Sequence, residues 1–215
     1  LAEYDIVIIM DDSGSMLLGD RWQQANLLTM VTKFDSDGVD IHFLNARENA
    51  APLQRNVKNG ESVRRLFSLV WPTTATPIGE RLDAILDDYL TKVEQTRFTE
   101  ASAKIKPINV IVITDGIPTD TGDMVPEKVI VRAAERLDRG RFPESQVGIQ
   151  FVQVGTDKGA HKYLKDLDDN LVRWCSDGRM RDIVDTTPCS TLRDEKLSKE
   201  TLLKIILGSI NRRVD

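Results

Sequence analysis

The stretch Ile6-Val7-Ile8-Ile9-Met10-Asp11-Asp12-Ser13-Gly14-Ser15 joins an apolar run to a polar turn. The run has no polar residue at alternate positions, which is typical of a strand that is buried on both faces. The turn places Asp11, Ser13 and Ser15 at alternate positions directly after it. Carboxylate and hydroxyl oxygens that converge at the end of a strand suit a hard divalent cation. The stretch therefore predicts a buried strand followed by a metal site.

Apolar runs and amphipathic segments alternate along the whole chain. Strands are predicted at residues 6–10, 39–44, 51–57, 108–114, 147–154 and 181–184. Helices are predicted at residues 22–34, 63–70, 78–93, 129–137, 160–167 and 198–213. This alternation indicates an α/β fold with a doubly wound, mostly parallel sheet, helices on both faces and one short antiparallel edge strand. No repeat or linker divides the sequence, so residues 1–215 are expected to form a single domain.

Composition narrows the classes of function. The 215 residues carry a net charge of -5, with basic and acidic residues interleaved, which argues against a nucleic-acid surface. No apolar run has the length needed to cross a bilayer, so no membrane association is expected. Only two cysteines, Cys175 and Cys189, are present, and the sequence has no Asn-x-Ser/Thr sequon. Both features predict an intracellular, cytoplasmic protein.

Two further polar loops are expected beside the first. In open α/β sheets, ligands bind at the carboxyl ends of the strands, near the point where the strand order reverses. Asp115 follows the apolar run 108–114, and Thr76 lies in a proline-rich loop ahead of a helix. With Asp11, Ser13 and Ser15 they offer two carboxylates and three hydroxyls. These groups nearly neutralise a divalent ion and, with water, complete the octahedral shell of Mg²⁺.

The three loops together resemble the metal-ion-dependent adhesion site of a von Willebrand factor A (vWA) domain. The matching segments occur in the family's order, and they are Asp11-x-Ser13-x-Ser15, Thr76 before Pro77-Ile78-Gly79, and Asp115-Gly116-x-Pro118-Thr119-Asp120. The resemblance implies that Ser13, Ser15 and Thr76 contact Mg²⁺ or Mn²⁺ directly, whereas Asp11 and Asp115 act directly or through water. It also implies that an Asp or Glu carboxylate of a partner protein fills the remaining position. The low cysteine content is similar to that of the stand-alone intracellular members.

Simpler interpretations exist for each of these loops. The turn after Asp11 is also typical of a cap for the following helix. Thr76 is also typical of an N-cap, and Asp115 of a tight turn. Asp12 is expected to face solvent or to cap the turn, and Trp71 either packs at the core or rim or contacts a partner.

Enzymatic alternatives fit the sequence less well. A Mg²⁺-dependent phosphotransferase or phosphatase with an aspartyl nucleophile needs a second acid two residues later, where this chain has Ser13. A serine hydrolase needs a Gly-x-Ser-x-Gly elbow and a histidine base, and a nucleotide site needs a glycine-rich phosphate loop. Neither motif is present. The sequence predicts a non-catalytic binding module, with a metal-free vWA scaffold that binds through helix surfaces as a further alternative.

Overall fold

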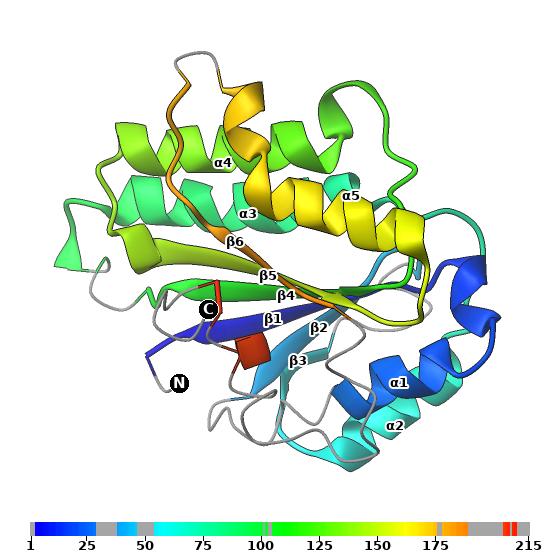
Figure 1. Cartoon of the computed structure of the whole chain (residues 1–215). Helices are drawn as coiled ribbons and strands as arrows, with labels where there is room; N and C mark the ends of the chain where they lie inside the picture. The colour runs from blue at the N-terminus through cyan, green and yellow to red at the C-terminus, as the bar shows by residue number, and fades with distance from the viewer. Residues whose placement is uncertain are drawn as a thin grey trace.

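Six strands form one sheet in the computed structural model of the chain (Figure 1). The structure describes residues 3–28, 38–46, 54–100, 102, 105–175, 178–188, 204–206 and 208–209. The strands are β1 (Asp5–Met10), β2 (Val39–Phe43), β3 (Gln54–Val57), β4 (Ile108–Thr114), β5 (Val147–Gln153) and β6 (Val184–Thr187). Their order is β3-β2-β1-β4-β5-β6, and every neighbouring pair is parallel except β2 and β3.

The strand order reverses between β1 and β4. From β1 the chain moves outward through β2 to β3, and it then returns to place β4 on the other side of β1. The paired register runs from Asp5 opposite Ile108 to Met10 opposite Ile113. The residues that follow both strands are therefore neighbours at the switch point, which is where ligands bind in this class of fold.

Helices cover both faces of the sheet, with α3, α4 and α5 on one side and α1 and α2 on the other (Figure 1). Their bounds are α1 (Arg21–Leu28), α2 (Gly60–Leu69), α3 (Ile78–Thr96), α4 (Pro126–Arg139) and α5 (Lys158–Asp169). The predicted doubly wound α/β sheet with an antiparallel edge strand is thus confirmed. Among the described residues, no helix is both long and apolar enough to span a membrane.

The pattern of β1 shows why its apolar run does not alternate with polar residues. Val7 and Ile9 pack into the core cluster beneath α3, α4 and α5. Ile6, Ile8 and Met10 pack into a second cluster on the opposite face, beneath α1 and α2. Successive side chains of a strand point to opposite faces, so a sheet covered on both sides requires apolar residues at every position.

The last strand differs from its predicted position. Residues 181–184 were expected to form it, but β6 is Val184–Thr187. Arg181 lies before the strand, where its guanidinium Nε donates to Asp138 Oδ1 at 2.7 Å and its Nη2 donates to the Phe142 carbonyl at 3.1 Å. These contacts hold Arg181 against the end of α4, and pairing with β5 starts only at Val184.

The predicted closing helix, residues 198–213, lies mostly outside the described residues. Residues 204–206 are helical, and this segment is attached to the sheet through a buried side chain of β4. Asn109 Nδ2 donates to the Ile206 carbonyl at 2.6 Å, and the Ser209 hydroxyl lies 3.0 Å from Asn109 Oδ1. Asn109 thereby satisfies its buried amide and fixes this part of the chain against the sheet.

Candidate metal centre

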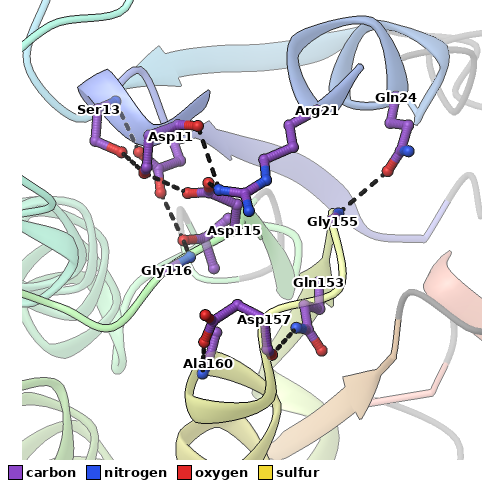
Figure 2. A network of polar contacts seen from close by, with 12 residues as sticks. Asp11, Ser13, Arg21, Gln24, Asp115, Gly116, Gln153, Gly155, Asp157 and Ala160 are labelled. Carbon is purple, nitrogen blue, oxygen red and sulfur yellow. Dashed lines mark hydrogen bonds and ion pairs between the residues drawn. The ribbon is translucent and has the colours of Figure 1, made fainter. Parts of the chain in front are cut away.

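Asp11 lies at the carboxyl end of β1, and two residues donate hydrogen bonds to its side chain. Its backbone N–H donates to the Ile113 carbonyl at 2.9 Å, which keeps the chain beside β4 past the end of the strand. One carboxylate oxygen accepts the Ser13 backbone N–H at 2.8 Å, and the other accepts the Thr114 hydroxyl at 2.6 Å (Figure 2). The residue is fully buried. The turn thus orients this carboxylate before any ligand arrives.

Ser13, Ser15 and Asp115 form a continuous chain of hydrogen bonds. The two serine hydroxyls lie 3.0 Å apart, and the Ser15 hydroxyl donates to Asp115 Oδ1 at 2.8 Å. Asp115 is 1% exposed, so its charge is withdrawn from bulk water. The loops after β1 and β4 therefore bring together three of the side chains predicted from the sequence.

Thr76 lies in the loop ahead of α3, and its hydroxyl is near that of Ser15. Among the described residues, it makes no hydrogen bond to the side chains of the other four candidate ligands. Its hydroxyl Oγ1 and the Ser15 Oγ each lie 4.0 Å from the point that a Cβ on Gly116 would occupy. Thr76 is itself 6% exposed. Because Gly116 has no side chain, nothing projects from this position into the space between the two hydroxyls. The Ser15 and Thr76 hydroxyls thus lie near Gly116, and hydrogen bonds connect Asp115, Ser13 and Asp11 to Ser15 at the switch point of the sheet.

Thr76 is held in place by residues of the loop after β4. Its N–H donates to the Thr119 hydroxyl at 3.0 Å, and its carbonyl accepts the Thr119 N–H at 3.0 Å. The two carboxylate oxygens of Asp120 accept the N–H groups of Gly79 and Glu80, each at 3.0 Å, and so cap α3. The alternative interpretation of Thr76 as the helix cap is wrong, because Asp120 takes that role and leaves the Thr76 hydroxyl available.

Asp120→Ala is expected to lower the free energy of unfolding by about 1–2 kcal/mol, because it removes a charged cap from the first turn of α3. Urea denaturation in a chelating buffer measures the change. Asp123→Ala is the matched control, since Asp123 belongs to the same loop but is exposed and pairs with Lys128 at the surface. Equal unfolding free energies for the two variants would contradict this role of Asp120.

Asp12 does not face solvent as expected. It is 2% exposed, and its carboxylate accepts the Asn45 N–H at 2.7 Å, the Asn45 side-chain amide at 3.0 Å and the Ala46 N–H at 2.8 Å. Burial raises the pKa of the Asp12 carboxyl above its ordinary value, against the opposing effect of these hydrogen bonds. Asp12 therefore fastens the β1 turn to the segment after β2. The sequence motif gave no sign of this role, because the partners are distant along the chain.

Arg21 is the second residue that the sequence did not reveal. At the start of α1, its guanidinium Nη1 forms an ion pair with Asp115 Oδ2 and donates to the Ser15 carbonyl at 3.3 Å (Figure 2). The side chain is 20% exposed, whereas that of Asp115 is fully buried. The contact joins residues that no local pattern relates. The candidate site thus contains a fixed positive charge as well as two carboxylates.

Burial raises the pKa of the Asp11 carboxyl from 3.8 to about 6, although the hydrogen bonds from Thr114 and Ser13 oppose the shift. Between these two values the folded state holds a proton that the unfolded state has lost. The unfolding free energy of the metal-free protein should therefore fall as the pH rises through this interval. Above the interval both states are ionised, and the whole penalty for the buried charge is present.

Asp11→Asn is expected to remove this pH dependence. Relative to the variant, the metal-free wild type should gain stability as the pH falls from about 7 toward about 4, by up to about 3 kcal/mol. Urea denaturation of both proteins at several pH values in a chelating buffer measures the difference. A difference that stays constant over this range would show that Asp11 titrates with an ordinary pKa.

The donor set has the chemistry of a site for a hard cation. The five side chains offer only oxygen, and neither sulfur nor imidazole takes part. Within the described parts of the chain, no three His, Cys, Asp or Glu side chains come together as a metal cluster. Three of the five candidate donors are hydroxyls, those of Ser13, Ser15 and Thr76. Such a set fits Mg²⁺ or Mn²⁺ better than zinc, which takes nitrogen and sulfur readily.

The fold is found in solved structures of other proteins. No protein-family model matches the chain, and no curated protein matches it either. Proximal thread matrix protein 1 from the mussel byssus is similar in two crystal forms, with TM-scores of 0.53 and 0.51 and 19% sequence identity in each. The match covers 97% of this chain and 48% of the matrix protein chain, so this chain spans about half the length of that protein. At this identity the likeness supports the α/β fold alone.

Proposed function

We propose that this chain is a non-catalytic interaction module of the vWA type, which holds Mg²⁺ or Mn²⁺ and binds a carboxylate of a partner protein through that ion. Asp11, Ser13, Ser15, Thr76 and Asp115 would hold the metal. The observation that carries the proposal is the hydrogen-bonded series Ser13–Ser15–Asp115 at the β1/β4 switch point. It joins two loops that are far apart in the sequence, and Thr76 borders the same space.

The balance of charge favours binding of an anion over catalysis. Three of the five donors are neutral hydroxyls, so an ion bound by them keeps much of its charge and attracts an external carboxylate. A phosphotransferase needs a second acid near Asp11. Position 13 is a serine, and the Asp12 carboxylate is bound to the segment after β2. The chain's own residues thus orient a ligand without supplying an evident acid–base pair.

The second candidate is a metal-free scaffold of the same fold. It is favoured by the ion pair between Arg21 and Asp115, because a guanidinium can neutralise a buried carboxylate without a metal. In that case the partner would bind elsewhere on the domain, and divalent ions would leave its affinity unchanged.

Exposed apolar side chains lie in all three loops that form the site. Leu17 and Leu18 follow the Ser15 turn and are 45% and 59% exposed, Trp71 precedes the Thr76 loop and is 74% exposed, and Ile117 follows Gly116 and is 52% exposed. The core position considered for Trp71 is therefore wrong. Exposed apolar surface on the loops that carry a polar centre suits contact with a protein. They support a protein partner over a small acid.

We also propose an intracellular location, which rests on the cysteine content. Cys175 is half-buried, with its thiol 4.0 Å from the Leu171 carbonyl, and Cys189 lies outside the described residues. Alkylation of both thiols in protein taken directly from cells would agree with a reducing compartment, whereas a quantitative disulfide would contradict it.

Selection from a peptide display library in the presence of Mg²⁺ tests the function against a wide range of candidate ligands. We expect the selected peptides to share an Asp or Glu, and to lose binding in EDTA or when that residue is changed to Asn or Gln. Recovery of binding with Mn²⁺ would show that the ion is the lost component. Binding that persists in EDTA would contradict the proposed function and favour the metal-free scaffold.

A further inference from the structure

Arg21 is fixed in the site by the shape of the loop after β5. Gly155 has a φ of +68°, and a Cβ at this position would lie 2.6 Å from the Arg21 Nε (Figure 2). The Gly155 N–H in turn donates to Gln24 Oε1 at 3.2 Å, which ties this loop to α1. A residue with a side chain would displace the guanidinium. The fold thus provides space for Arg21 beside Asp115.

The two carboxylate oxygens of Asp115 have different partners. Arg21 contacts Asp115 through Oδ2, whereas the other oxygen, Oδ1, accepts the Ser15 hydroxyl. Arg21 therefore contacts a different oxygen of Asp115 from the one that binds the Ser15 hydroxyl. A metal ion among the hydroxyls and the guanidinium can thus share the same carboxylate, but each lowers the negative charge available to the other.

We propose that Arg21 shifts binding energy from the metal to the partner: it weakens the binding of a divalent ion alone and strengthens the binding of the carboxylate that completes the ion's shell. This inference rests on the proposed function. With Arg21 present, Asp11, Asp115 and the guanidinium carry one net negative charge, and a divalent ion turns this into one net positive charge. A single carboxylate from the partner then makes the complete site neutral.

Removal of Arg21 should strengthen metal binding and weaken the attraction of the bound ion for a carboxylate. Two carboxylates alone equal the formal charge of a divalent ion, so without Arg21 the ion binds more tightly and attracts a third carboxylate less strongly. Wild-type protein should therefore show positive coupling between metal and carboxylate, in which each raises the affinity for the other by the same factor. In Arg21→Gln this coupling should be weaker.

Calorimetric titration of metal-stripped protein with Mn²⁺, in acetate and in chloride at equal ionic strength, measures both quantities. We expect Arg21→Gln to bind Mn²⁺ about tenfold more tightly than wild type in chloride, which is the lower end of the effect of one nearby charge. Acetate should tighten Mn²⁺ binding more in wild type than in Arg21→Gln. Arg21→Lys restores the charge and should restore part of the coupling.

Arg64→Gln is the matched control, because it removes the same charge from an exposed position on α2. It should behave as wild type, which separates the local effect from that of net charge. Thermal unfolding of each metal-free variant checks that the fold is retained. A purely structural role of Arg21 predicts the opposite result, since a disordered site would bind Mn²⁺ more weakly.

The outcomes separate this inference from the proposed function. Tighter Mn²⁺ binding and weaker coupling in Arg21→Gln support the inference, as does binding by the variant when wild type binds no ion. Equal or weaker binding by the variant, with wild type binding normally, overturns the role of Arg21 and leaves the metal site standing. If neither protein binds Mn²⁺ in chloride or acetate, the proposed function fails and the inference fails with it.

Discussion

Asp115→Ala and Asp11→Ala are each expected to weaken Mg²⁺ and Mn²⁺ binding by at least about a hundredfold, since loss of a supporting group alone can cost that much at a metal site. Either substitution removes half of the negative charge that compensates the ion. Asp115→Ala also deprives the Ser15 hydroxyl of its acceptor, and Asp11→Ala deprives the Ser13 N–H of its acceptor. The donors that remain are therefore both less charged and less well oriented.

The fold should survive the change at Asp115. In the metal-free protein, its removal relieves repulsion with the Asp11 carboxylate. Arg21 loses its ion pair, but its guanidinium is partly exposed and keeps the Ser15 carbonyl as an acceptor. Calorimetry measures the affinity, and circular dichroism confirms the fold. Asp123→Ala serves as the control, because it removes an exposed carboxylate from the same loop. Wild-type affinity in both site variants would show that the ion, if bound, lies elsewhere.

Gly79→Ala is expected to have the largest effect on stability. A Cβ at Gly79, in the first turn of α3, would lie 1.7 Å from the Met124 carbonyl oxygen and 3.1 Å from the Pro126 nitrogen. Both are backbone atoms, so the loop after β4 or the start of α3 has to move. Overpacking of this kind costs about 3 kcal/mol. The same movement separates Asp120 from the helix it caps and disturbs Thr76.

Gly60→Ala is the matched control for this prediction. Gly60 also lies in the first turn of its helix, but the nearest atom to its Cβ position is the Arg64 Nη1 at 3.8 Å. There alanine should be neutral or should stabilise the protein by about 0.5–1 kcal/mol, because it restricts the unfolded chain. Urea denaturation compares the two variants. Similar unfolding free energies would show that the loop after β4 moves away from the new Cβ without a loss of stability.

The part of the site that the sequence predicted is the part that follows from strand topology. Ser13 and Ser15 follow one apolar run and Asp115 follows another, and the carboxyl ends of adjacent parallel strands meet at one edge. Asp12 and Arg21 were not predicted in their roles, because each depends on a contact with a distant segment. The role of Asp12 depends on where Asn45 lies, and the role of Arg21 depends on the space that the loop after β5 leaves beside it.

The sequence likewise predicted the class of fold but not every element position or contact. Strands with continuous apolar residues identified a sheet covered on both faces, and the structure confirms it. The position of β6 was not predicted, because Val184–Thr187 contains only one apolar residue and owes its register to pairing with β5. The capping of α3 by Asp120 was not predicted either, since it depends on the conformation of the loop after β4.

Anomalous diffraction from crystals grown with MnCl₂ tests the metal site most directly. We expect one strong peak at the β1/β4 switch point, about 2.1 Å from the hydroxyls of Ser13, Ser15 and Thr76. Arg21 should remain on Asp115 Oδ2. A peak at another position, or no peak at this site with Mn²⁺ in excess, would contradict the metal site and the proposed mode of binding.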